Sequence, residues 1–134
     1  TTALHLDDER AQLLLEGLLP APEAALADAR QMESEVLAGR FRGRLHGVPV
    51  GIKDLCYTAG LETTAGSTLL AGFVPTFDAT VVRRLQEAGA ILLGKTATTE
   101  FASADPAVTR NPWNPAHTPG GSSSGSAEAD PRRT

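Results

Sequence analysis

Two helix-like segments, each followed by a short apolar segment, constrain the fold more than any other feature of the sequence. Small and apolar residues recur every three or four positions over 21–38 and again over 78–88, which predicts two amphipathic helices. Branched apolar residues bounded by turn formers predict a buried strand after each helix, at 45–53 and at 90–93. The order helix, strand, helix, strand predicts an α/β architecture in which helices cover a sheet.

The helix patterns also predict individual roles. Asp78 is expected to be the N-cap of the second helix, because an aspartate side chain accepts hydrogen bonds from the first free backbone N–H groups of a helix. The side chains expected to face the core are Ala25, Ala29, Met32 and Val36 in the first helix and Val81, Val82 and Leu85 in the second.

A proline-rich segment separates these elements from a stretch of glycine and serine. Four prolines within 105–119 predict a loop without regular structure. The side chain of Trp113 in this loop is expected to be buried. The stretch 120–126 that follows can be a flexible linker, a turn that presents a nucleophile, or part of a lysine-assisted site. A short helix is expected to open at 126–129.

Two stretches match catalytic or binding motifs letter by letter, but the predicted elements and residues around them are not those that the motifs require. Residues 89–96 match the phosphate-loop pattern G-x-x-x-x-G-K-[ST], but their middle residues are those of a strand and a helix precedes them. Residues 121–125 match the nucleophile elbow G-x-S-x-G with Ser123 at the centre, an arrangement that needs a preceding strand and a later histidine. The three histidines, His5, His46 and His117, all precede it, so neither motif is favoured.

Composition excludes several classes of protein. A chain of 134 residues with 41% apolar residues has the size and apolar content of a folded domain, and a net charge of -4 gives no field that would attract nucleic acid. Cys56 is alone, so no internal disulfide forms, and no window holds the about 18 apolar residues of a membrane span. No secretory signal opens the sequence, which makes the cytoplasm the expected location.

Lys53 is the candidate base. Apolar surroundings at the end of a strand disfavour a charged ammonium, and a neutral amine can take the proton that a serine hydroxyl loses when it attacks a carbonyl. Asp54 is expected to point to the opposite face of the strand, so an ion pair between Lys53 and Asp54 is not expected. A serine of the Gly/Ser stretch within reach of Lys53 would complete a serine–lysine device.

These stretches, in this order, resemble the amidase signature family from about Ala21 to Ala129. The matching stretches are GRLHGVPVGIKDL at 43–55, TTAGS at 63–67, DATVV at 78–82, GKT at 94–96, EF at 100–101, TRNPW at 109–113 and PGGSSSGSA at 119–127. The resemblance implies the N-terminal part of the amidase signature fold, a mixed sheet covered by helices. It also divides the chain into an N-terminal extension at 1–20, the amidase part at 21–129 and an unrelated polar tail at 130–134.

The resemblance further implies a Ser-cisSer-Lys triad that hydrolyses carboxylic amides without a metal or cofactor. Lys53 matches the family's base, and Ser122 matches the bridging serine, which follows a cis peptide bond. Ser123, Ser124 and Ser126 are expected to be structural hydroxyls that satisfy the tight loop. The implied partner is a small-molecule amide, with no nucleic acid and no membrane involved.

The family's attacking serine belongs to a second Gly/Ser segment beyond the last residue of this sequence. The chain is therefore expected to be incomplete and inactive, with part of its sheet exposed. A non-catalytic remnant or a small-molecule binding module is the alternative. The amidating component of a transfer-RNA-dependent amidotransferase is a third alternative, which the short connection at 100–113 disfavours relative to a general amidase.

Overall fold

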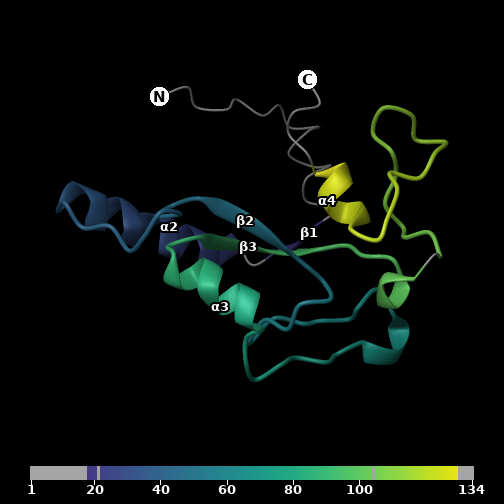
Figure 1. Ribbon diagram of the computed structural model, residues 1–134, viewed down its shortest axis with the longest axis horizontal. Helices are drawn as coiled ribbons and strands as arrows, with labels where there is room; N and C mark the ends of the chain where they lie inside the picture. The colour runs from purple at the N-terminus through teal and green to yellow at the C-terminus, as the bar shows by residue number, and fades with distance from the viewer. Residues whose placement is uncertain (1–17, 21, 104, 130–134) are drawn as a thin grey trace.

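A three-stranded mixed sheet organises the chain in the computed structural model, which describes residues 18–20, 22–103 and 105–129, with side chains from Glu23 onward (Figure 1). The strands β1 (Leu18–Pro20), β2 (Pro49–Lys53) and β3 (Ile91–Thr96) lie in the order β1-β3-β2. The central strand β3 pairs antiparallel with β1 and parallel with β2. The predicted α/β class is confirmed, although the sequence pattern did not predict β1.

Three α-helices accompany the sheet: α2 (Pro22–Leu37), α3 (Thr80–Glu87) and α4 (Ser124–Glu128). Two 3-10 turns, η1 (Thr68–Leu70) and η2 (Glu100–Ala102), lie in the connections. The helix predicted at 21–38 is confirmed, and the short helix predicted from 126 begins two residues earlier. Within the described part of the chain, no helix has the length and apolar character needed to cross a bilayer. The tail predicted at 130–134 and most of the extension predicted at 1–20 lie outside the described residues.

The helix α2 packs against β3 through alanines and one methionine. Ala25 and Met32 are buried against Ile91 of β3, with Ala29 partly buried beside them. Val36 was predicted to join this face, but it is 42% exposed because the last turns of α2 project beyond the sheet (Figure 1). The face of α2 that packs on the central strand therefore runs from Ala25 to Met32 and does not include Val36.

The short helix α3 buries only one narrow face. Val82 is fully buried and Leu85 is half-buried, but Val81 is 51% exposed, so the prediction that it faces the core is wrong. Asp78 is not the N-cap, which is Ala79 without a side-chain hydrogen bond. The Asp78 carboxylate instead accepts a hydrogen bond from the backbone N–H of Ala59 at 2.7 Å, because a distant loop offers a donor in better position than the helix does.

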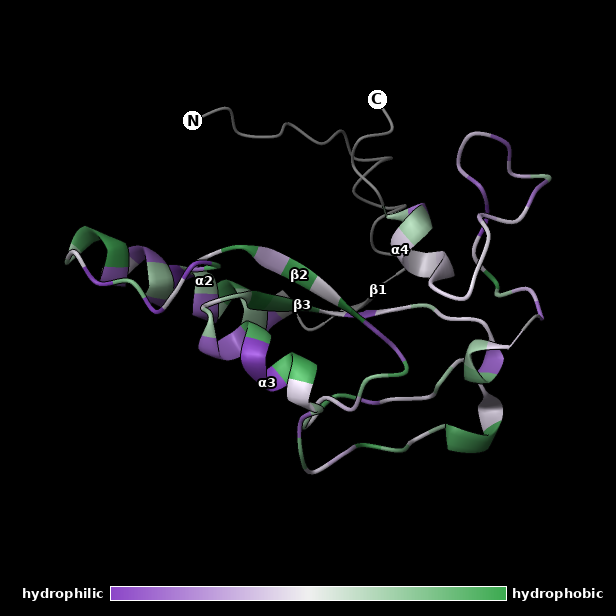
Figure 2. Ribbon diagram, viewed as in Figure 1, coloured by the Kyte–Doolittle hydropathy of each residue, from purple (hydrophilic) through white to green (hydrophobic). Residues whose placement is uncertain are grey.

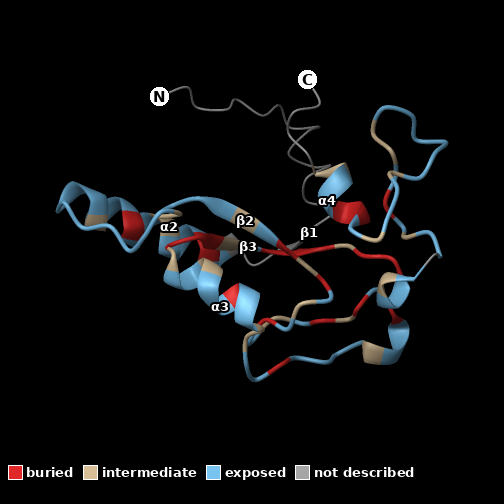
Figure 3. Ribbon diagram, in the orientation of Figure 1, coloured by how far each residue is buried: buried red, intermediate tan, exposed pale blue. Residues whose placement is uncertain are grey.

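The strand that carries Lys53 is shorter and less buried than predicted. Residues 45–47 lie in turns, in which the N–H groups of Leu45 and Gly47 donate to the carbonyls of Ala88 and Gly89, just after α3, rather than to a strand partner. Within β2 only Ile52 is buried, because β2 is an edge of the described sheet. The opposite error occurs in β3, which continues past residue 93 to Thr96. Buried residues follow β3 and the extended segment after it (Figure 3).

The turn that leads into β2 is held to α2 by an arginine. The Arg42 guanidinium donates from Nε and Nη2 to the two carboxylate oxygens of Glu35, each at 2.8 Å. This paired hydrogen bond lowers the pKa of the Glu35 carboxyl from 4.5 to about 2. His46, in the same turn, donates from Nε2 to the carbonyl of Met32 at 3.1 Å. Two side chains thus fix the entry of β2 relative to α2.

Figure 2 shows apolar residues along the loop before α3, and several of their large side chains are exposed. Tyr57 contacts Phe73 and Phe77 with ring centroids 5.3 and 5.5 Å apart, and Phe77 is 61% exposed. The irregular structure predicted for 105–119 is confirmed for the described residues, but Trp113 is 72% exposed. Its loop projects away from the sheet (Figure 1), so no core is within its reach.

Candidate active site

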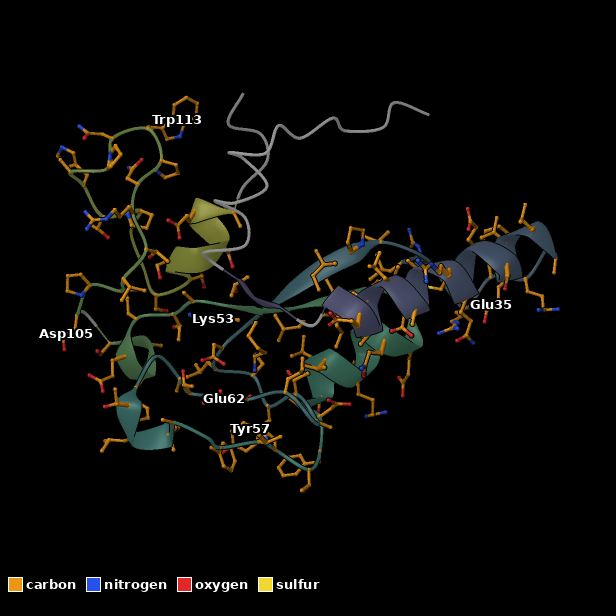
Figure 4. All side chains as sticks on the ribbon, turned by 180° about the vertical axis from the view of Figure 1, so that it is seen from behind. Glu35, Lys53, Tyr57, Glu62, Asp105 and Trp113 are labelled. Atoms are coloured by element: carbon orange, nitrogen blue, oxygen red, sulfur yellow. The ribbon has the colours of Figure 1, made fainter. Side chains whose placement is uncertain are left out.

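The parallel pairing of β2 with β3 places Lys53 next to the Gly/Ser segment. Lys53 is the last residue of β2 and lies in register with Thr96, the last residue of β3. The helix α4 contacts both strands, so the segment that leads into it passes over these two residues. The Lys53 Nζ atom donates a hydrogen bond to Ser122 Oγ at 2.6 Å across 69 residues of sequence. Figure 4 shows Lys53 beside α4, well separated from Glu35 and Trp113 at the two extremities of the view.

Ser122 is held at its side chain and at its backbone. The peptide bond between Gly121 and Ser122 is cis, as the resemblance implies. The Ser122 carbonyl accepts two hydrogen bonds, from Thr98 Oγ1 at 2.9 Å and from the backbone N–H of Thr99 at 3.2 Å. The half-buried serine is therefore fixed between Lys53 and the segment that follows β3.

The start of α4 is packed directly against the same segment. The N–H of Gly125 donates to the carbonyl of Ala97 at 3.0 Å, and the hydroxyls of Ser126 and Thr96 lie 3.3 Å apart. A Cβ atom on Gly125 would lie 2.4 Å from the backbone nitrogen of Ala97, so only glycine allows this approach. The flexible-linker interpretation of the Gly/Ser stretch is therefore wrong.

This contact predicts the effect of enlarging Gly125. The Gly125→Ala substitution would gain up to about 1 kcal/mol of helix propensity, but the backbone clash with Ala97 requires α4 to move and is expected to cost more. We expect a net loss of about 1–3 kcal/mol in the free energy of unfolding, measured by urea denaturation. The control is Ser123→Ala, because Ser123 is exposed and makes no side-chain cap bond; its effect should stay within about 0.5 kcal/mol. Equal stability of the two variants would contradict the expectation.

The prediction that Ser123, Ser124 and Ser126 all serve as structural hydroxyls of the tight loop is only partly confirmed. Ser126 contacts the Thr96 hydroxyl, but the Ser124 hydroxyl is fully buried without a hydrogen-bond partner among the described residues. Ser123 follows bends rather than a strand, so the nucleophile-elbow interpretation is wrong. Among the serines of this segment, Ser122 is the one whose hydroxyl meets the lysine.

The chain's second lysine is buried on β3. Lys95 is 1% exposed, and its Nζ atom donates to the Cys56 carbonyl at 2.6 Å and to Thr63 Oγ1 at 2.8 Å. It also forms an ion pair with Asp54 Oδ1 at 3.5 Å. A lysine enclosed within a strand cannot reach a phosphate, so the phosphate-loop interpretation of 89–96 is wrong. Burial lowers the pKa of Lys95 from 10.5, and the Asp54 carboxylate opposes part of that shift.

Asp54 faces Lys95 and not Lys53, which agrees with the opposite-face prediction. Its Oδ2 atom accepts hydrogen bonds from the N–H and the hydroxyl of Thr64, and its own N–H donates to the Thr96 carbonyl at 2.9 Å. The residue directly after Lys53 is thus tied to β3 by its backbone and by a buried ion pair. This pair was not predicted, because its only signal in the sequence is a lysine within a branched apolar strand.

Thr98 also lines an open cavity of about 490 Å³, whose walls include Ser67, Glu100 and Val108. The Ser67 hydroxyl donates to Glu100 Oε1 at 2.6 Å across this wall. No three histidine, cysteine, aspartate or glutamate side chains in the described ranges are grouped so that they could hold a metal ion. The chemistry that this arrangement offers on its own residues is proton transfer between an amine and a hydroxyl.

A lysine amine that is hydrogen-bonded to a serine hydroxyl on an α/β scaffold is the arrangement used by serine–lysine hydrolases. Comparison with known proteins narrows this class. The model of the family described as amidase matches residues 8–129, and the chain belongs to this family. The match begins at residue 8, upstream of Ala21, from which the resemblance was predicted to extend.

Relatives of two kinds are similar to the chain. One is a component of the glutamyl-tRNA(Gln) amidotransferase of Picosynechococcus sp., 49% identical over 113 residues, which are 80% of this chain and 23% of that protein. Another is a Mycobacterium tuberculosis protein named as an amidase, AmiD, 48% identical over 108 residues, which are 78% of this chain and 23% of that protein. The solved structure of the peptide amidase of Stenotrophomonas maltophilia matches with a TM-score of 0.77 at 38% identity, over 90% of this chain and 28% of that one. The chain thus spans about a quarter of the length of these relatives.

Proposed function

We propose that these residues supply the base and the bridging serine of an amide-hydrolysing site. The observation that carries the proposal is the 2.6 Å hydrogen bond between Lys53 Nζ and Ser122 Oγ. In its neutral form the Lys53 amine accepts the Ser122 hydroxyl proton, while Ser122 Oγ accepts the proton of the serine that attacks the amide carbon. The proton returns along the same path to the departing nitrogen, which leaves the acyl group on the attacking serine as an ester. A water molecule then attacks this ester, its proton passes along the same relay to the serine oxygen, and the carboxylate is released.

The substrate in this proposal is a small carboxylic amide, and the products are a carboxylate and ammonia or an amine. The short connection at 100–113 favours a general amidase over a component of a transfer-RNA-dependent amidotransferase. Relatives of both kinds have nearly the same identity to the chain, so identity does not separate the two. A net charge of -4 supports a substrate other than nucleic acid.

The resemblance assigns the attacking serine to another segment of the family's fold, so the proposal has two parts that can be tested together. The 134-residue chain is expected to show no amide turnover above the uncatalysed rate. A hybrid in which residues 22–129 replace the matching segment of the Stenotrophomonas maltophilia peptide amidase is expected to hydrolyse that enzyme's amide substrate. Product formation, followed by chromatography, measures both.

The hybrid needs a control for folding, because two segments of different origin must pack together. Its far-UV circular dichroism and cooperative thermal unfolding should match those of the parent amidase. A folded hybrid without turnover would overturn the proposal and support the non-catalytic binding module. Turnover by the 134-residue chain alone would overturn the assignment of the attacking group to another segment.

A further inference from the structure

We infer that the Thr98 side chain is a positioning group for Ser122: its hydroxyl fixes the Ser122 carbonyl so that the serine hydroxyl stays within reach of Lys53. The inference rests on the proposed function for its catalytic meaning, but its geometry can be tested without catalysis. No sequence motif of the amidase resemblance includes Thr98, and its residue type alone gives no signal.

The hydrogen bonds of Ser122 carry the inference. Thr98 Oγ1 donates to the Ser122 carbonyl at 2.9 Å, and the Thr99 N–H donates to the same oxygen at 3.2 Å. On the other side of the residue, Ser122 Oγ accepts from Lys53 at 2.6 Å. Because these contacts hold opposite ends of one residue, a rotation of the Ser122 backbone that frees the carbonyl also moves Oγ relative to Lys53.

Thr98 lies two residues after Thr96 on the extended backbone that continues from β3, and this spacing explains why its hydroxyl reaches the Ser122 carbonyl. Side chains alternate along an extended chain, so Thr96 and Thr98 point to the same side. Both hydroxyls meet the Gly/Ser segment, Thr96 at Ser126 and Thr98 at the Ser122 carbonyl. The backbone after β3 therefore presents two successive hydroxyls to the segment that contains the bridging serine.

Thr98 is itself rigidly supported, which a positioning group requires. It is 4% exposed, and its carbonyl lies 2.6 Å from the place where a Cβ of Gly66 would be. The next residue, Thr99, is anchored by a hydrogen bond from its hydroxyl to the Ser103 carbonyl at 2.8 Å. The backbone that carries the threonine hydroxyl is therefore closely packed against Gly66 and anchored through the next residue.

The test uses the fact that the chain contains only two lysines, Lys53 and Lys95. A 134-residue chain labelled with ¹³C only in lysine gives two ε-carbon signals, and the Lys53→Met variant assigns them. The Ser122→Ala variant then defines how far the Lys53 signal moves when its hydrogen-bond partner is lost. This signal reports the surroundings of one side chain and not the stability of the fold.

The Thr98→Val variant removes the hydroxyl and keeps the shape of the side chain. We expect the Lys53 signal to move in the same direction as in Ser122→Ala and by most of that shift, whereas Thr98→Ser, which keeps a hydroxyl, should restore the original position. The matched control is Thr109→Val, because the Thr109 hydroxyl is also buried but has no hydrogen-bond partner among the described residues. That control should leave the Lys53 signal in place.

An unmoved Lys53 signal in a folded Thr98→Val variant overturns the inference, and so does a signal that moves equally in Thr98→Ser. If Thr98→Val does not fold, Thr98→Cys keeps a similar size with a weaker donor, and its Lys53 signal should lie between those of the original chain and Ser122→Ala. A Lys53 signal that Ser122→Ala itself leaves unmoved contradicts the lysine–serine pair, and with it the proposed function. The two failures are therefore distinguishable.

Discussion

The Lys95→Met substitution is expected to lower the free energy of unfolding by about 3–5 kcal/mol, because it leaves the Asp54 carboxylate buried without its counter-charge. Lys95 is 1% and Asp54 2% exposed, so water cannot replace the lost partner without opening the structure. The Cys56 carbonyl and the Thr63 hydroxyl lose a donor as well. Urea denaturation followed by circular dichroism measures the change.

The chain supplies its own matched control. Lys53→Met removes the same side chain at the only other lysine, which is half-buried and makes one hydrogen bond, so a loss of about 1 kcal/mol is expected. The Asp54→Asn/Lys95→Met double variant removes both buried charges and should be more stable than Lys95→Met alone. If the losses of the two single variants simply add in the double variant, the ion pair does not couple these residues.

The same pair predicts a pH dependence whose sign follows from the lowered pKa of Lys95. Between that pKa and the ordinary 10.5, the unfolded chain binds more protons than the folded chain, so stability contributed by this group rises with pH. Below the folded-state pKa the penalty for burying the charged amine is fully present. The part of the alkaline gain that Lys95 contributes should therefore disappear in the double variant, which lacks this buried amine.

Local patterns predicted the parts of the fold that depend on local physics. The three- and four-residue periodicity of 21–38 predicted α2, because an amphipathic helix carries its burial pattern in its own sequence. Branched apolar residues bounded by turn formers predicted the strand that ends at Lys53, although its start was placed four residues too early. The strand β1 has only three residues, too few for any periodicity to appear.

Non-local contacts account for the errors. Asp78 has the residue type of a helix cap, but its partner is Ala59, 19 positions earlier, and no local pattern reveals that donor. Lys95 matched a phosphate loop because the motif records letters and not the strand that contains them. The resemblance pointed to Lys53 and Ser122, whereas Thr98 became visible only when the structure placed its hydroxyl on a carbonyl 24 residues away.

These contacts connect the buried ion pair with the candidate site. Lys53 and Asp54 are adjacent, and one engages Ser122 while the other engages Lys95 on the opposite side of the strand. The hydroxyls of Thr96, at the end of β3, and of Thr98, just after it, face the Gly/Ser segment, whereas Lys95 faces Asp54. The two strand ends thus separate a charged structural contact from the amine and hydroxyl proposed for catalysis.

The second large effect is expected in the peptide amidase hybrid, where Lys53→Arg should lower kcat/KM by about 10³-fold, within the usual range for loss of a general base. An arginine keeps a positive charge and hydrogen-bond donors, but its guanidinium does not deprotonate in a protein and cannot accept the Ser122 proton. Lys53→Met should cost about the same, and combining it with Ser122→Ala should add little, because the two groups act as one unit. Arg83→Lys, at an exposed pair on α3, should leave the rate unchanged. A Lys53→Arg hybrid that retains its rate would show that Lys53 only donates a hydrogen bond, and the proton acceptor would then have to be another group.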